Sequence, residues 1–181
     1  ADRVDDITGR RINGRSRQHV LWRPMKGSGR NQDLTLSQQL LFLKANPAIG
    51  GGGTVRANKL TWQVPIQPTA LARSYLATVT YRPGQTPDVQ IEDPDLELLA
   101  DGRPLPHVYR NPLRLCLYLP RTREWEARKR IDQTVIPWTY LWLYYFEDWL
   151  WSDDWKGAGQ HPGDLPEPIG NRALRRAAAR S

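Results

Sequence analysis

Cysteine and histidine are scarce in this 181-residue chain, and their scarcity excludes several kinds of site. There is one cysteine, Cys116, and there are three histidines. A single cysteine excludes an intrachain disulfide and any zinc site built from several cysteines. The histidines, His19, His107 and His161, are scattered and form no metal-ligand spacing. The sequence therefore predicts no bound metal, and a lone thiol fits a reducing cytoplasm, where we expect this protein.

Long apolar runs and phosphate-binding loops are also missing. The longest apolar stretch, Val135 to Phe146, is interrupted by Pro137 and Thr139, and a membrane-spanning helix needs about 20 apolar residues. The first 30 residues are basic and polar, so no signal peptide is expected. The glycines at 50–53 lack the Lys-Ser/Thr end of a phosphate loop. We predict no cofactor and no membrane partner.

Positive charge is concentrated at the two ends of the chain. The formal charge is +7, yet residues 1–32 and 156–181 are net positive and residues 33–155 carry a net charge of −1. We therefore predict a flexible basic arm at 1–32, one folded domain at 33–155, and a Gly/Pro-rich loop with a basic tail at 156–181. Nucleic-acid binding through the tails is a minor alternative.

Hydrophobic periodicity predicts an α+β domain. Leu34 to Asn46 reads as a helix with a capping box at Thr35 and Gln38, and the glycines at 50–53 read as a loop. Alternating apolar residues predict three consecutive strands, which form an antiparallel meander of three to four strands. The first strand holds Leu60 to Ile66, and Pro65 would place that strand at an edge or a bulge of the sheet. The second holds Tyr75 to Tyr81, and the third holds Val89 and Ile91.

Later segments are less regular until a Trp-rich helix. Residues 95–112 read as irregular, and the helix spans Pro137 to Trp155. One face of that helix is predicted to be core; its members are Trp138, Leu141, Trp142, Tyr145 and Trp149.

Cys116 lies in a short run of alternating leucines. In an extended segment, Leu113, Leu115, Leu117 and Leu119 would face the core, and Cys116 would point away from it. Nearby arginines, Arg110, Arg114 and Arg121, would favour the thiolate, or they simply form a solvated face. An inert cysteine is the alternative to a reactive one.

The residues around Cys116 resemble the active-site motif of ubiquitin-conjugating (UBC) enzymes. The chain has His107-Val108-Tyr109, then Leu115-Cys116-Leu117, and then Trp125. A helix, a meander and a long irregular stretch precede them, in the element order of that fold. The resemblance implies a UBC-like fold over 33–155, in which Cys116 carries another protein's C-terminus as a thioester. Tyr109 and Trp125 would be supporting residues.

The chain departs from the motif directly after the histidine. The family has Pro-Asn there, whereas this chain has Val108. That asparagine is linked in the family to stabilising the oxyanion formed when a lysine attacks the thioester. We assign His107 and Asn111 to the catalytic site with Cys116. His107 would organise the loop or act as a base, and Asn111 would be either a displaced oxyanion donor or part of an Asn-Pro turn.

The downstream sequence is similar to the stand-alone conjugating-enzyme-like proteins of short type II CBASS anti-phage operons. The similar stretches are residues 134–139, 142–150 and 157–162. This resemblance implies a cGAS-like nucleotidyltransferase partner whose C-terminal residue is activated and joined to a target. The acceptor and the means of activation stay open.

Two alternatives remain beside a thioester-forming enzyme. One is a catalytically silent UBC-fold binding protein, which the missing Pro-Asn favours. The other is a nucleic-acid-associated protein with basic tails. For the enzyme and for the silent binding protein alike, we expect Trp149, Trp151 or Trp155 to contact the protein partner, because the Trp-rich segment is aromatic on more than one face.

Overall fold

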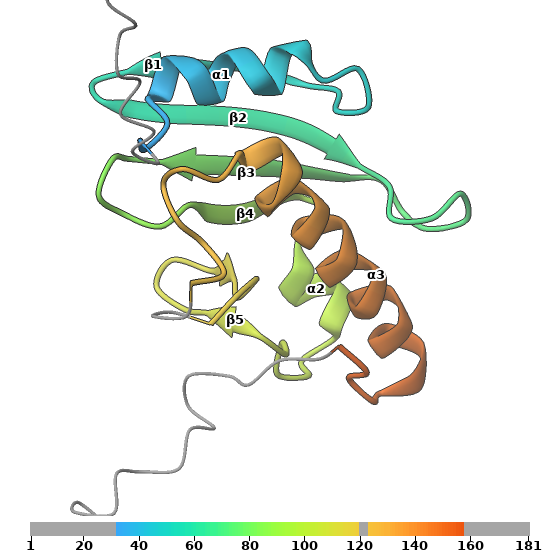
Figure 1. Cartoon of the computed structure of the whole chain (residues 1–181). Coiled ribbons are helices and arrows are strands. Elements are labelled where there is room, and N and C mark those ends of the chain that lie inside the picture. Colours follow the sequence, from blue (N-terminus) through green and yellow to red (C-terminus); the bar gives the residue numbers. More distant parts are fainter. Residues whose placement is uncertain (1–31, 120–122, 158–181) are drawn as a thin grey trace, which may run out of the picture. The chain divides into compact units, whose positions relative to one another are not determined.

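The computed structural model describes residues 32–119 and 123–157, and a four-stranded antiparallel sheet lies at its centre (Figure 1). The sheet is a meander in the order β1-β2-β3-β4. Its strands are β1 (Gly52–Arg56), β2 (Lys59–Ile66), β3 (Tyr75–Tyr81) and β4 (Asp88–Asp93). The meander is confirmed. The basic arm predicted at 1–32 and the tail predicted at 156–181 fall almost wholly outside the described residues.

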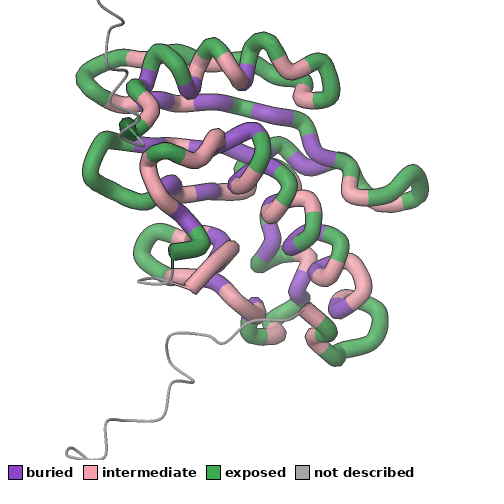
Figure 2. Tube along the Cα trace, viewed as in Figure 1, coloured by how far each residue is buried: buried purple, intermediate pink, exposed green. Residues whose placement is uncertain are grey.

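One face of the sheet forms the core, as the alternation predicts. On β2, Leu60, Trp62, Val64 and Ile66 are buried, and the intervening residues are half-buried or exposed. Trp62 pairs with Val79 of β3. Because paired residues place their side chains on the same face of a sheet, both side chains point into the core. Figure 2 shows the buried stretches along β2 and β3.

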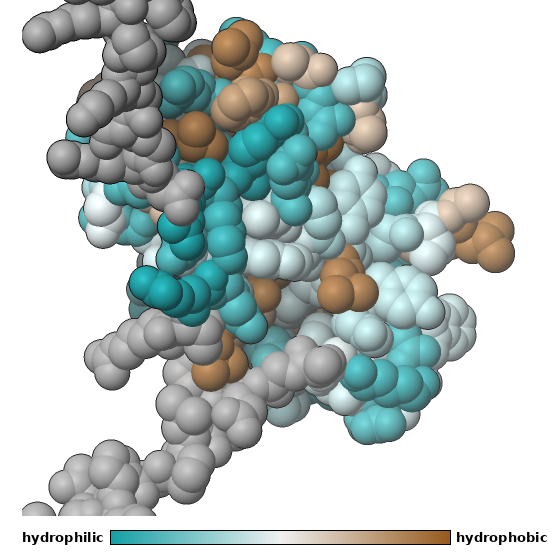
Figure 3. All heavy atoms as spheres, in the orientation of Figure 1, coloured by the Kyte–Doolittle hydropathy of each residue, from teal (hydrophilic) through white to brown (hydrophobic). Residues whose placement is uncertain are grey.

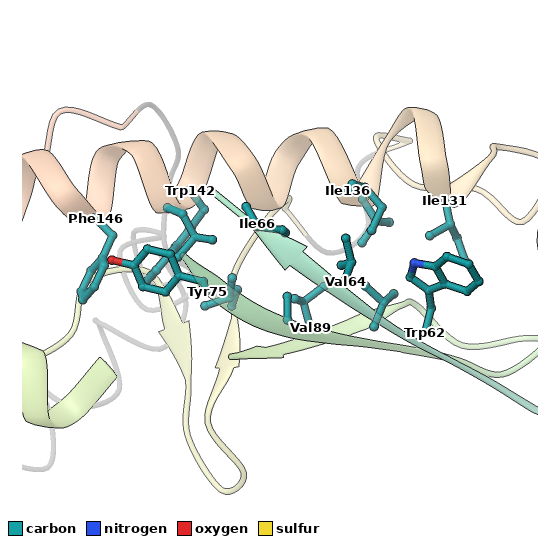
Figure 4. Packing of buried hydrophobic residues seen from close by; sticks show 14 of the residues in the cluster. Trp62, Val64, Ile66, Tyr75, Val89, Ile131, Ile136, Trp142 and Phe146 are labelled. Carbon is teal, nitrogen blue, oxygen red and sulfur yellow. The ribbon is translucent and has the colours of Figure 1, made fainter. Parts of the chain in front are cut away.

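Two helices cover this face. They are α1 (Leu36–Ala45) and α3 (Val135–Ser152), and a short 3-10 helix, η1 (Ile131–Gln133), precedes α3. Figure 4 shows Ile136, Trp142 and Phe146 of α3 directed toward the sheet residues of the core. The capping box of α1 is confirmed, because Thr35 accepts from the Gln38 N–H and the Gln38 side chain accepts from Thr35 N–H. No helix among the described residues is long and apolar enough to cross a bilayer.

Gln39 joins α1 to the chain before α3. Its side chain is fully buried and donates to the Lys129 carbonyl at 2.8 Å, while its oxygen accepts from the Ile131 N–H at 3.0 Å. Without this bond the Ile131 N–H would be left unsatisfied in the interior. The amide therefore fixes the position where the chain enters η1 and α3.

Three predictions about the meander and its flanks are wrong. The glycines at 50–53 are not all loop, since Gly52 and Gly53 begin β1, where a Cβ on Gly53 would lie 2.9 Å from the Trp62 ring. β2 is internal to the sheet, and Pro65 is tolerated because the ladder with β1 ends at Gln63. The segment 95–112 is not wholly irregular, because it contains α2 (Leu96–Ala100), which Asp95 caps.

The Trp-rich helix is confirmed, but its core face is rotated from the prediction. The helix begins at Val135, and Pro137 lies in its first turn, where a missing N–H costs little. Trp142 and Trp149 are buried as expected, while Trp138 and Tyr145 are half-buried and Leu141 is 51% exposed. The other core residues of the helix are Val135, Ile136, Thr139, Leu143 and Phe146. The predicted face therefore lies beside the core and leaves a surface available for another role.

Candidate active site

Cys116 lies at the open end of a small hairpin. The hairpin consists of β5 (Val108–Tyr109) and β6 (Arg114–Leu115), and Val108 pairs with Leu115. The Cys116 N–H donates to the His107 carbonyl at 2.9 Å, which extends the pairing by one step. Because residues opposite one another share a face, Cys116 and His107 lie on the face opposite to Val108 and Leu115, which are buried.

The Cys116 thiol has a direct side-chain partner in Tyr109. The sulfur donates to the Tyr109 hydroxyl at 3.4 Å. The Arg114 guanidinium lies over the Tyr109 ring at 5.6 Å and also pairs with Asp88 at 2.9 Å. The hairpin thus places thiol, phenol and guanidinium on one side, with the arginine already neutralised by a carboxylate.

A pocket of about 110 Å³ lies in front of the sulfur. Its remaining walls come from the hairpin, from α3 and from the chain that follows α3. The lining residues are His107, Cys116, Leu117, Trp138, Leu141, Trp142, Tyr145, Trp155 and Gly157. The predicted helix face therefore does have a function in the architecture, since four of its five members form the wall opposite the thiol.

Cys116 is less accessible than the sequence suggests. Cys116 lies on the hairpin face opposite to Leu115, as predicted. However, α3 packs over that face, and Cys116 is only 8% exposed. Leu113, Leu117 and Leu119 are only half-buried, so the predicted leucine face is also incomplete. Burial raises the pKa of the Cys116 thiol, while the Tyr109 hydrogen bond lowers it and Glu124 raises it further. The resting thiol is therefore protonated at neutral pH.

The predicted arginine effect on the thiol is wrong for the two described arginines. Arg110 pairs with Glu97 at 3.1 Å, and Arg114 pairs with Asp88. Neither contributes to the shift in the thiol pKa, which is upward. Arg121 lies outside the described residues.

His107 is held in an uncommon backbone conformation beside the thiol. Its φ is +46°, in the left-handed region that non-glycine residues rarely adopt. The His107 carbonyl accepts from the Cys116 N–H and from Trp142 Nε1 at 3.1 Å. Its ring stacks on Trp155 with centroids 5.2 Å apart. Such strain persists where the surroundings fix it, and it is typical of functional sites.

The structure does not bring Asn111 to the pocket. Asn111 is exposed at the tip of the hairpin, with φ +61° and a cis bond to Pro112, whereas Cys116 is at the other end. Asn111 therefore forms the Asn-Pro turn and lies at the opposite end of the hairpin from the thiol, where an oxyanion donor would be out of place. Trp125 packs edge-on against Tyr81 at 5.8 Å and is not among the residues that line the pocket in front of Cys116, so in this structure it is a packing residue.

The three tryptophans predicted to contact a partner have different environments. Trp149 is buried, stacks on Phe146 and lies under the Arg103 guanidinium, so it is a core residue and the prediction is wrong for it. Trp155 lines the Cys116 pocket. Trp151 is 86% exposed and borders a groove with Leu71, at the loop between β2 and β3. Figure 3 shows the hydrophobic tip of that projecting loop.

Metal binding finds no support in the part of the chain that is described. No group of three histidine, cysteine or acidic side chains gathers there in a way that could hold an ion. His19 and His161 lie outside it.

The sequence reasoning missed the second wall of the site. Helical spacing predicts a core face that contains Trp138, Leu141, Trp142 and Tyr145; the spacing is right, but this face lines the Cys116 pocket. The available signal was a second apolar set, Ile136, Leu143 and Phe146, on another face of the same helix. A helix that is apolar on two faces has two surfaces to cover.

One comparison with known proteins identifies the family. The family model described as "E2-CBASS: Type II CBASS E2 protein" matches residues 39–162, which is more than half of the chain and includes the hairpin, Cys116 and α3. No curated protein matches the chain. The family match and the order of helix, meander and helix together confirm the UBC-like α+β fold. The chain therefore belongs to the type II CBASS E2 family, and it has a conjugating-enzyme-like role in CBASS defence with a protein partner from the same operon.

Proposed function

We propose that Cys116 carries the C-terminus of a protein partner, a cGAS-like nucleotidyltransferase, as a thioester and passes it to an amine or another acceptor. The observation that carries this proposal is the position of the chain's single cysteine in a pocket between the hairpin and α3. A structural cysteine would be enclosed by packed aliphatic side chains, whereas Cys116 lines a pocket and its sulfur hydrogen-bonds a phenol.

The chemistry has two steps, and neither requires a cofactor in this chain. The partner's carboxyl group arrives already activated, because no phosphate loop is predicted here. The Cys116 thiolate attacks the carbonyl carbon, the C–S bond forms, and the activating group leaves with its bonding electrons. An amine then attacks the thioester, the C–N bond forms, the amine loses a proton, and the thiolate is released.

Deprotonation of the thiol is the step that the site must assist. Because burial raises the pKa of Cys116, little thiolate exists at neutral pH in the free protein. His107 lines the same pocket and has its backbone fixed by two hydrogen bonds. We propose that the imidazole organises the loop and accepts the proton as the partner's tail enters.

A silent binding protein is the second candidate, and the burial of Cys116 favours it. A thiol that is 8% exposed with a raised pKa is less reactive than an exposed one. In that case the protein would bind its partner through the conjugating fold and form no covalent bond.

Co-expression with the operon's nucleotidyltransferase tests the two candidates. The first predicts an adduct that thiol reagents remove, that Cys116→Ala abolishes, and that Cys116→Ser either converts to a thiol-resistant ester or abolishes. The second predicts that the nucleotidyltransferase co-purifies equally well with the wild-type protein and with Cys116→Ala, and that neither forms an adduct. Absence of any adduct under conditions in which the partner is activated would refute the enzyme proposal.

A further inference from the structure

The residues that follow α3 turn back over Cys116. Asp153 ends the helix in the left-handed conformation, with φ +58°. Figure 1 shows the chain after α3 returning toward β5. Trp155 and Gly157 from this segment line the pocket in front of the sulfur. We call residues 153–157 the strap.

Trp155 is the part of the strap that forms a wall of the Cys116 pocket. Its ring stacks on His107 and lies 5.6 Å from the Trp142 ring and 6.0 Å from the Tyr145 ring, centroid to centroid. The indole therefore joins the hairpin to α3 across the pocket. In this arrangement Cys116 is 8% exposed.

Surface interactions hold the rest of the strap. Arg103 pairs with Asp153 at 3.1 Å, and the Asp153 side chain is 72% exposed. Lys156 pairs with Asp148 at 2.9 Å on the exposed side. Ion pairs at this degree of exposure contribute little to stability. Residues 154–157 also belong to no helix or strand.

The closed position leaves one polar group unsatisfied. Trp155 Nε1 is buried and finds no acceptor among the described residues. A buried N–H without an acceptor disfavours the state that buries it. Outside the pocket the indole N–H would hydrogen-bond to water. Opening therefore removes the free-energy cost of burying this N–H without an acceptor.

We propose that the strap is a gate, in which Trp155 closes the Cys116 pocket and must move outward before the thiol can react with a protein C-terminus. A carbonyl carbon must reach bonding distance of the sulfur, and a peptide tail needs a path to it. Trp155 forms the part of the pocket wall that joins the hairpin to α3, so its position affects the width of that path. The role of the gate in conjugation rests on the proposed function, but the gate itself is a property of the free protein and can be measured without the partner.

Gly157 supplies an independent way to disturb the gate. A Cβ at this position would lie 2.7 Å from Trp155 Nε1, closer than side chains approach one another. Alanine at 157 therefore forces the indole or the strap to shift. Trp151 offers a matched control, since it is also a tryptophan near the end of α3 but is 86% exposed and lines a different groove.

The test is the rate at which iodoacetamide alkylates Cys116 in the full chain, followed by intact mass over a range of pH. Rates extrapolated to full ionisation separate access to the sulfur from its acidity. Trp155→Ala and Gly157→Ala should each react about tenfold faster than wild type if the gate is open a tenth of the time, because the rate scales with the open fraction. Trp151→Ala should react at the wild-type rate.

Equal limiting rates for wild type, Trp155→Ala and Gly157→Ala would overturn the gate. So would a wild-type rate equal to that of the denatured chain. If Trp155→Ala loses its cooperative thermal transition, Gly157→Ala decides the question. Faster alkylation in the variants combined with no thioester adduct on the wild type would leave the gate in place and refute the proposed function.

Discussion

At the scale of single residues, the balance between burial and reactivity at Cys116 governs the chemistry. Cys116 is largely buried, yet it lines a pocket with α3 and the strap, and its sulfur contacts a phenol. Burial is the largest cause of its raised pKa, and the Tyr109 hydrogen bond opposes it. Both effects are measurable in the free protein.

We expect the alkylation rate of Cys116 to keep rising with pH beyond the point at which an ordinary thiol is fully ionised. The reason is that burial disfavours the thiolate and so raises the pKa. The measurement is the pH profile of iodoacetamide alkylation for the folded chain and for the chain in denaturant. A folded profile that coincides with the denatured one would show that the thiol is not desolvated.

The same shift predicts how stability depends on pH. The folded pKa lies above the unfolded one, so the contribution of this group is fully present below the unfolded thiol pKa, about 8.5. It is lost as pH rises through the folded pKa. Cys116→Ser should therefore lose less stability than wild type between neutral and alkaline pH, as measured by urea unfolding.

Tyr109→Phe should raise the pKa of Cys116 further, because the phenol O–H donates to the sulfur once the thiol is ionised, and this bond lowers the pKa. At pH 8 we expect alkylation to slow about fivefold, which corresponds to a hydrogen bond worth about 1 kcal/mol. Tyr118→Phe is the matched control, since its hydroxyl bonds the Pro87 carbonyl at 3.1 Å and not the thiol. Equal effects of the two changes would exclude a specific role for Tyr109.

At the scale of elements, α3 forms both the core and the wall of the pocket, and its position depends on α1. The Gln39 side chain makes that link through two hydrogen bonds, one to the Lys129 carbonyl and one from the Ile131 N–H. Asp132 in η1 adds to it by accepting from Asn46 at 3.0 Å and from Arg130. The sequence signalled the helix of Gln39 but not this polar link.

Gln39→Ala should lower the free energy of unfolding by about 2 kcal/mol, since it leaves the buried Ile131 N–H without its acceptor. Gln85→Ala, at an exposed turn, should change it by less than about 0.5 kcal/mol. Urea unfolding followed by tryptophan fluorescence measures both. A loss at Gln39 no larger than that at Gln85 would show that the amide does not tie the helices together.

The elements that the sequence predicted share a strong period. The alternation from Leu60 to Ile66 and the cap at Thr35 determine local structure directly, so β2 and α1 form where expected. β1 and α2 were missed because glycine has no strand preference and because α2 has five residues, too few for a helical period. The orientation of α3 depends on which of two apolar faces meets the sheet, and tertiary packing decides that.

At the scale of the whole molecule, the family match gives the role and the site gives the hypothesis for its chemistry. The lone thiol and the surrounding motif point to Cys116, but they do not predict the pocket that it lines. They do not predict the strap's place in that pocket either, because the strap lies 37 or more residues after Cys116 and no local pattern predicts that it returns. The basic ends and the nucleic-acid alternative concern residues outside the described ranges and stay predictions.

The most direct test of the central claim is intact-mass spectrometry of the protein isolated with its activated partner. We predict one added mass equal to the partner's mass less one water, located on Cys116 by peptide mapping, and lost on treatment with dithiothreitol. An adduct that persists in Cys116→Ala, or an unmodified Cys116 while the partner is demonstrably activated and joined to another protein, would contradict the claim.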